Sequence, residues 1–231
     1  MNSFSIRDVI DAFLAETGKN GTDKKQLMVV LQDLFLAGSE TTGKTMEWAC
    51  LFMIIYPEIQ EKVQKEIDLK IGSHEEVTAA DRCNLPYTEA VLHEVWRCGP
   101  VAPIPATRCP REDTKVGKYL IPAGTVVFNN LYSMTKDASL WGPDVDSFNP
   151  DRFIGSDGHF KNTWWDFTFG TGQRKCLGES VAKLENFLFF ANLLKNFKLG
   201  IPDGFEKPSM EPMDGMAIGP KHFSAKLTLR N

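Results

Sequence analysis

FGTGQRKCLG, residues 169–178, is the stretch of sequence that decides how this chain folds and what it can bind. It places Cys176 at the end of a loop with three glycines and two cations, directly before residues 179–197, whose apolar side chains recur at helical spacing. Cys176 is therefore expected at the positive, N-terminal end of a helix. Cations and a helix N-terminus favour the thiolate, which is the form of cysteine that acts as ligand or nucleophile. Glycines, which lack a Cβ, let the backbone approach a large group closely.

Four other kinds of site do not fit this loop. A Walker phosphate loop needs Gly before its Lys and Ser or Thr after it, but Arg174 and Cys176 stand there. A dinucleotide fingerprint needs a third Gly where Lys175 stands, and a thiol-dependent phosphatase needs an arginine where Ala182 stands. The chain also has no CxxC pair for a cysteine metal site. What remains is one axial thiolate in a glycine-rich collar, as haem iron uses in the thiolate class.

The ten-residue stretch resembles the haem-ligand loop of the cytochrome P450 family, FxxGxRxCxG, at every fixed position. The resemblance implies a mainly α fold with small β-sheets (α+β), with residues 1–231 as the carboxyl-terminal part of a single domain. It implies haem b (iron protoporphyrin IX), with Cys176 as the axial iron ligand. Arg174 and Arg108 would bind the propionates through fork-shaped guanidinium groups, and Phe169 would shield the sulfur. The implied cofactor contacts are Cys176, Arg174, Arg108, Phe169, Gly172, Gly178, Ala37 and Gly38.

A second motif, AGSETT at residues 37–42, lies inside a long helical pattern. A glycine within a helix costs about 1 kcal/mol relative to alanine. The Thr41 hydroxyl can compete for the carbonyl of Ala37 and locally loosen the helix. An acid beside an alcohol makes a proton-delivering pair. The motif resembles the family's oxygen-binding groove, which implies that Thr41 orders bound dioxygen and its protons while Glu40 helps to relay them.

A third motif is the pair Glu94 and Arg97, three residues apart on a predicted helix. Taken alone, such a pair is a surface interaction of about 0.2–0.5 kcal/mol. A zinc-protease HExxH motif is excluded because Arg97 occupies the second ligand position. The family's ExxR pattern matches instead, and Arg152 in FNPDRF (residues 148–153) would complete it. The resemblance implies a structural triad of Glu94, Arg97 and Arg152 that supports the haem loop.

Composition narrows the function further. The 231 residues suit one domain or a small pair. The net charge of −4, without a dense Lys/Arg tract, gives no indication of nucleic-acid binding. Five cysteines without framework spacing indicate a reducing compartment. The histidines show no ligand spacing and are interpreted as ordinary; they are His74, His93, His159 and His222.

The sequence pattern also predicts the order of elements. Helices are expected over residues 6–15, 24–56 (capped by Thr22 or Asp23), 57–71, 87–98 and 179–197. Strands are expected at 119–121 and 125–128 around a turn at 122–124, and at 197–201 and 222–229. Residues 137–172 are expected to form a long loop that wraps around something.

The resemblance implies a monooxygenase that inserts one oxygen atom of dioxygen into a small hydrophobic substrate, of the xenobiotic, fatty-acid or steroid class. Electrons would come from an NADPH-dependent flavoprotein reductase, and Lys175 with Lys183 could contribute a basic docking face. The apolar pocket would be lined near Leu34 and Ala37, along 101–105 and around 216–218.

The resemblance covers the carboxyl-terminal half of the family pattern. The amino-terminal anchor and early helices of that pattern are not found. The intact family member is expected on the cytoplasmic face of the endoplasmic reticulum membrane, whereas this chain, with no anchor or signal, is expected to be cytoplasmic. The alternative is a truncated, inactive remnant or interaction module that binds haem weakly or not at all. The undamaged motifs favour a partial sequence of a working enzyme.

Overall fold

The computed structural model describes residues 6–17, 24–72, 75–161 and 167–230. The expected helix cap at Thr22 or Asp23, and His74, lie outside these residues. The chain divides into two compact units, 1–40 and 41–231, which are described separately. The helices are α1 (Val9–Thr17), α2 (Lys24–Ile55), α3 (Pro57–Ile71), α4 (Pro86–Cys98), α5 (Leu131–Thr135), α6 (Ala138–Trp141) and α7 (Glu179–Asn196), with 3₁₀ turns η1 (Ala79–Asn84), η2 (Pro150–Phe153) and η3 (Gly172–Arg174).

The strands are short and form antiparallel pairs. They are β1 (Thr114–Val116) with β2 (Tyr119–Ile121), β3 (Phe197–Gly200) with β6 (Lys226–Leu229), and β4 (Pro212–Met213) with β5 (Gly219–Pro220). This architecture of long helices and small sheets confirms the predicted fold class. It also confirms the four longer helices to within two residues and the closing strand β3, whereas β6 covers only the second half of the strand predicted at 222–229.

The first unit contains α1 and the beginning of α2. The expected helix over residues 6–15 is shifted, because α1 begins at Val9 and ends at Thr17. The side chain of Asp8 accepts a hydrogen bond from the Asp11 backbone at 2.9 Å, as an N-cap residue does. Helix α1 therefore begins where its first free N–H groups find an acceptor.

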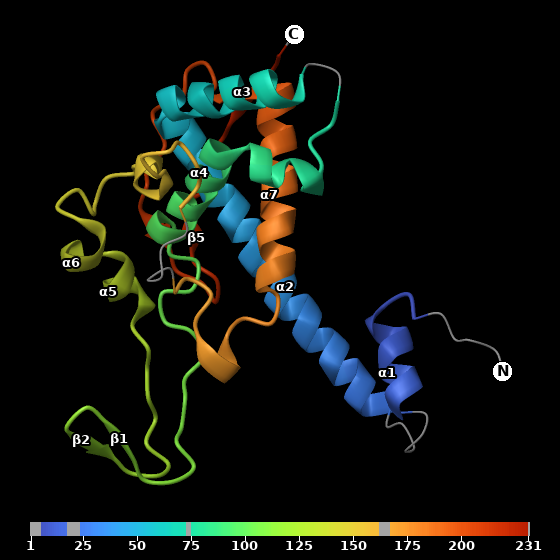
Figure 1. Ribbon diagram of the computed structural model, residues 1–231, viewed down its shortest axis with the longest axis vertical. Coiled ribbons are helices and arrows are strands. Elements are labelled where there is room, and N and C mark those ends of the chain that lie inside the picture. The colour runs from blue at the N-terminus through green and yellow to red at the C-terminus, as the bar shows by residue number, and fades with distance from the viewer. Residues whose placement is uncertain (1–5, 18–23, 73–74, 162–166, 231) are drawn as a thin grey trace. The chain divides into compact units, whose positions relative to one another are not determined.

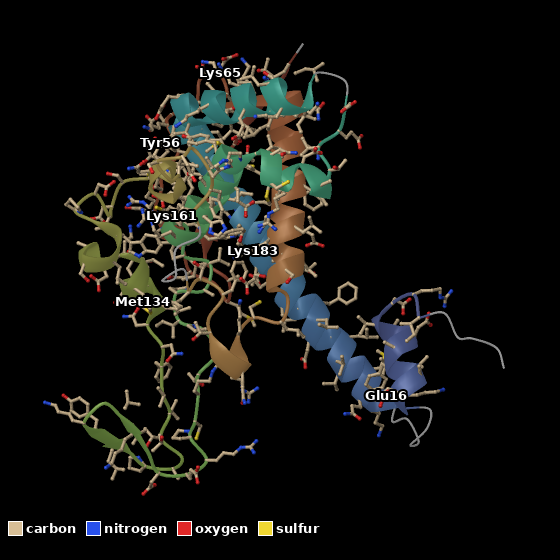
Figure 2. The ribbon with its side chains drawn as sticks, in the orientation of Figure 1. Glu16, Tyr56, Lys65, Met134, Lys161 and Lys183 are labelled. Atoms are coloured by element: carbon tan, nitrogen blue, oxygen red, sulfur yellow. The ribbon has the colours of Figure 1, made fainter. Side chains whose placement is uncertain are left out.

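The corner between α2 and α3 follows from proline chemistry. Pro57 occupies the first turn of α3, where its missing N–H costs nothing, and it disfavours helical geometry at Tyr56, which has φ −120° and ψ 71°. Tyr56, labelled in Figure 2, stacks on Phe148 with ring centroids 5.3 Å apart, and Phe148 stacks on Phe52 at 4.4 Å. These rings join α2 to the segment that precedes η2.

Buried polar side chains connect α3 to the rest of the second unit. Gln60, fully buried, donates to the carbonyls of Met53 and Leu199 and accepts from the Leu199 N–H at 2.7 Å. Glu66 accepts from the backbone N–H groups of Tyr87 and Thr88, both at 2.7 Å, and so caps α4 from another helix. Helix α4 is buried along its whole length from Tyr87 to Arg97 and forms the centre of the unit.

The region from residue 99 to 172 differs from the prediction in two places. Strand β2 pairs with β1 through a turn at Gly117, which has a positive φ of 58°, and not with residues 125–128. Residues 125–128 make one isolated bridge, between Val127 and Arg108, instead of a strand. Figure 1 shows the β1–β2 hairpin at the end of two extended segments, away from the helices of the same unit.

The long loop expected at 137–172 is also partly ordered into short helices. Asp137 caps α6 by accepting from the Ser139 N–H at 2.8 Å, and Asn149 caps η2 by accepting from the Asp151 N–H at 3.2 Å. Helix α5, just before the loop, is capped by Asn130 in the same way. Elements this short show no hydrophobic periodicity, so only their cap residues could have indicated them.

Candidate active site

The loop that holds Cys176 is closed by backbone hydrogen bonds. The Cys176 N–H donates to the Phe169 carbonyl at 2.9 Å, and the Lys175 N–H donates to the Gly172 carbonyl at 3.1 Å. Gly170 and Gly172 have positive φ angles of 75° and 68°, which other residues rarely adopt. The glycines therefore permit a compact turn that ends at the cysteine.

Cys176 is exposed and stands three residues before α7, with Gly178 as the residue that precedes the helix. A Cβ built at Gly172 or Gly178 would meet no atom within 4 Å, so the surface here is open. Leu177, next to the cysteine, leaves 90% of its surface exposed. The predicted position of the cysteine at the N-terminus of a helix is confirmed, and it lies beside an uncovered apolar side chain.

The other cysteines differ in their chemical state. Burial raises the pKa of the Cys50 thiol to about 11 and that of the Cys98 thiol to about 12, so both remain protonated at neutral pH. Cys83 and Cys109 are also exposed, and Cys83 stands three residues before α4, within the 3₁₀ turn η1. Among the cysteines, only Cys176 combines exposure and a helix N-terminus with a loop of positive-φ glycines.

Arg108 reaches the cysteine loop from an extended segment. Its backbone exchanges hydrogen bonds of 2.9 and 2.8 Å with the backbone of Val127, and these bonds fix the position of the Arg108 Cα atom. One guanidinium nitrogen, Nη2, lies 3.4 Å from the carbonyl oxygen of Arg174. The fold thus brings together the two arginines predicted to bind carboxylates, although they are far apart in the sequence.

Glu94, Arg97 and Arg152 form one buried ion cluster. Arg97 Nε and Nη2 donate to the two carboxylate oxygens of Glu94 at 2.7 and 2.8 Å, and Arg152 Nε donates to Oε1 at 3.0 Å. The Asn149 N–H donates to the same oxygen at 2.7 Å. The Glu94 side chain is fully buried, so the pair is not the surface interaction that its spacing alone would suggest.

The cluster also fixes the surrounding chain. Arg97 donates to the carbonyls of Thr135, Val145 and Ser147 at 2.7–2.9 Å. Arg152 donates to the carbonyl of Trp141 at 2.7 Å. Because a buried guanidinium needs an acceptor for each N–H, these carbonyls hold segment 135–147, which contains α6, against α4. Sequence reasoning could not find these contacts, since backbone carbonyls carry no sequence signal.

A second ion cluster follows Cys176. Glu179 lies between Lys175 and Lys183, and Lys183 Nζ is 3.0 Å from Glu179 Oε1. Burial raises the pKa of the Glu179 carboxyl. Hydrogen bonds from the two lysines lower this pKa by more than burial raises it, so the net shift is downward. Lys183 is only 16% exposed, which contradicts its expected place on a docking face; Lys175 is 51% exposed and stays a candidate.

The AGSETT motif lies on α2 across the boundary of the two units. Ala37, Gly38 and Glu40 are exposed in the first unit, and Thr41, half-buried, begins the second. The motif does not end the helix, since α2 continues from Lys24 to Ile55. Thr45 donates its hydroxyl hydrogen to the Thr41 carbonyl at 2.9 Å, a polar contact that the motif did not indicate.

Two of the expected substrate-pocket segments meet near α2. The Ile218 N–H donates to the Val101 carbonyl at 2.9 Å, and the Trp48 indole N–H donates to the Ile218 carbonyl at 3.1 Å. A Cβ at Gly99 would lie 2.7 Å from Trp48 Cγ, so only glycine allows this approach. The sequence did not predict that Trp48 contacts these segments. Gly99, directly after α4, was the sequence feature that could have indicated the close approach.

Comparison with known proteins gives the family. The cytochrome P450 family model matches residues 1–227, and the chain therefore belongs to the cytochrome P450 family. Cytochrome P450 2D9 of Mus musculus is 38% identical over 231 residues, covering 97% of this chain and 46% of that protein. Cytochrome P450 2J2 of Homo sapiens is 41% identical over 225 residues, covering 95% and 44%. The chain spans about half the length of these curated relatives.

A solved structure gives the same result. A zebrafish cytochrome P450 with abiraterone superimposes with a TM-score of 0.90 at 31% identity, covering 98% of this chain and 55% of that chain. None of the helices in the described part of the chain has the length and apolar character needed to cross a membrane.

Proposed function

We propose that this chain carries the haem-thiolate centre of a monooxygenase that acts on small hydrophobic molecules. Cytochrome P450 proteins hold haem b through a cysteine thiolate. The observation that carries the proposal is the closed glycine loop that presents an exposed Cys176 at the N-terminus of α7.

The residues present fit this cofactor. Haem combines an apolar ring with two carboxylates, and the loop offers an exposed Leu177 beside the thiol and the two arginines Arg108 and Arg174. The open space at Gly172 and Gly178 accommodates a flat group close to the backbone. Cys176 would hold the iron, and the arginines would hold the propionates.

The chain's own residues supply the rest of the chemistry. Haem, when bound, supplies the oxidation in which one oxygen atom of dioxygen enters a C–H bond. The Thr41 hydroxyl would hold and deliver a proton, with Glu40, its neighbour in α2, as the relay to solvent. Val101 and Ile218, joined by their backbone hydrogen bond, would present an apolar wall to the substrate. The Glu94 cluster would keep α4 fixed behind the loop.

Electrons would come from an NADPH-dependent flavoprotein reductase, and the intact family member would lie on the cytoplasmic face of the endoplasmic reticulum membrane. Lys175, exposed beside the loop, is a candidate contact for that donor.

The competing function is a non-catalytic remnant or interaction module. The exposed apolar residues next to Cys176 would then contact a partner protein instead of haem. The two functions differ in a direct way, because only the enzyme requires Cys176 to bind iron.

The experiment is the absorption spectrum of the reduced, carbon-monoxide-bound chain after reconstitution with haem. A red-shifted Soret band of the thiolate type is expected for the native chain and should be lost in Cys176→Ala. Cys109→Ala, which removes an exposed cysteine elsewhere, is the matched control and should keep the band. An imidazole-type band, or no uptake of haem, would support the non-catalytic alternative.

A further inference from the structure

Lys183 lies in the second turn of α7 and is labelled in Figure 2. Its ammonium nitrogen is 5.2 Å from the ring centroid of Phe169 and 5.5 Å from that of Trp96. A cation within about 6 Å of an aromatic face is attracted by the ring quadrupole, most strongly for tryptophan. The side chain therefore stays close to these rings, which agrees with its low exposure.

The two rings connect α4 to the cysteine loop. Trp96 and Phe169 meet edge to face, with centroids 5.4 Å apart and an interplanar angle of 77°. This is a favoured geometry for aromatic pairs. Trp96 stands between Glu94 and Arg97 in the sequence, and Phe169 is the residue whose carbonyl accepts from the Cys176 N–H. One stack thus joins the helix of the buried ion cluster to the backbone of the cysteine.

The indole nitrogen of Trp96 supports a role for the ring itself. Buried tryptophans usually donate this N–H to an acceptor, but Trp96 Nε1 is buried and has no hydrogen-bond partner among the described residues. Trp96 also contacts His93 edge to face at 4.8 Å. The contacts of the Trp96 side chain are therefore those of its ring, with His93, Phe169 and Lys183.

We propose that Lys183 and Trp96 are positioning residues for Cys176, which hold Phe169, and through its carbonyl the cysteine backbone, in the geometry of the ligand loop. Glu179 assists, because its ion pair with Lys183 brings the lysine back across the first turn of α7. The role of Cys176 as a ligand rests on the proposed function, but the contacts of Lys183 and Trp96 are present in the chain without haem and can be tested without it.

The test is amide hydrogen exchange of the 231-residue chain, measured by mass spectrometry for Lys183→Met and Lys183→Arg. Met keeps the apolar stem without the charge, and Arg keeps the cation. In Lys183→Met, peptides covering 167–178 should exchange about three- to tenfold faster, while peptides from α3 and α4 should not change. Lys183→Arg should restore the native rate, because Arg also stacks on aromatic rings.

Two further variants sharpen the test. Trp96→Phe keeps an aromatic ring and should exchange like the native chain, whereas Trp96→Leu should behave like Lys183→Met. Lys195→Met is the matched control, because it removes a lysine from the other end of α7, where Nζ donates to the Gly72 carbonyl. It should leave the exchange of 167–178 unchanged.

The proposal is overturned if Lys183→Met leaves the loop unchanged, if Lys183→Arg is as damaging as Lys183→Met, or if exchange rises equally throughout the second unit. The spectrum of the reduced, carbon-monoxide-bound native chain distinguishes this failure from failure of the proposed function. A native chain without the thiolate-type band refutes the haem proposal, while the exchange result still decides the role of Lys183.

Discussion

Two carboxylates in the second unit each lie between two cations, and their surroundings differ. Glu94, between Arg97 and Arg152, is fully buried, and its partners also bind backbone carbonyls of segment 135–147. Glu179, between Lys175 and Lys183, is only partly buried, beside the cysteine loop. The charges are arranged alike, but only the first cluster is removed from water.

The difference teaches what each cluster can do. A buried charge without its partner costs several kcal/mol, so the Glu94 cluster specifies how the chain packs around α4. Ion pairs that keep contact with water contribute less to stability, so the partly exposed Glu179 cluster can orient side chains near Cys176 without determining the fold.

The largest effect is expected for Glu94→Gln. The change leaves Arg97 without its paired carboxylate and Arg152 with only the partly exposed Asp144, and it should lower the free energy of unfolding by about 3–5 kcal/mol. Urea unfolding followed by circular dichroism measures it. Glu61→Gln is the control, since Glu61 is exposed and 3.8 Å from Lys198. A Glu94→Gln chain as stable as this control would remove the distinction between the two clusters.

Glu89, five residues before Glu94 on α4, should make the free energy of unfolding depend on pH. Burial raises its pKa, but hydrogen bonds from Arg82 and His93 lower it more, to about 2. Because this folded value lies below the ordinary 4.5, the stabilisation is complete above pH 4.5 and is lost as pH falls towards 2.

Glu89→Gln should therefore cost on the order of 3 kcal/mol at pH 7, and this difference from the native chain should shrink through the same window. Unfolding free energies measured from pH 7 to pH 2.5 test this. Glu211→Gln, which alters an exposed pair with Lys221, should show a much smaller dependence. A Glu89→Gln deficit that stays constant with pH would contradict the assignment.

Glycines near α4 and near the cysteine should also respond differently. Gly99→Ala would place a Cβ 2.7 Å from Trp48 Cγ and should cost about 1–3 kcal/mol through overpacking. Gly178→Ala meets no atom within 4 Å and should change stability by less than about 0.5 kcal/mol. Thermal unfolding of the two variants compares them directly, and equal costs would show that the loop is as tightly packed as α4.

A small effect is also expected for Glu179→Gln. Removing this partly exposed carboxylate should change the free energy of unfolding by less than about 1 kcal/mol. Urea unfolding alongside Glu94→Gln completes the comparison. A loss as large as that of Glu94→Gln would mean that the cluster beside Cys176 also holds the fold.

Local sequence patterns predicted much of this protein. The periodicity of residues 24–56 and 179–197 indicated long helices, because burial of one helix face repeats along the chain. Pro57 marked the corner after Ile55, since proline restricts the residue before it. The glycine loop identified Cys176 as the ligand candidate, because only a few residue types permit its geometry.

Other features depended on contacts between distant segments. The partner of β2, the short helices α5 and α6, and the bridge at Val127 follow from turns and caps that periodicity does not report. The burial of Glu94 was not evident from its spacing with Arg97, which alone describes a surface pair. Trp48 and Trp96 gave no sign of their partners, Ile218 and Phe169, in the linear sequence.

The sequence by itself determined the family motifs, the long helices and the cysteine at a helix start, because each depends on residues close together in the chain. Only the tertiary structure decided that Arg108 lies beside Arg174, that Arg97 holds segment 135–147, and that Lys183 lies over Phe169 and Trp96. These pairings depend on the distances and burial that arise when separate segments pack together, and no local pattern specifies them.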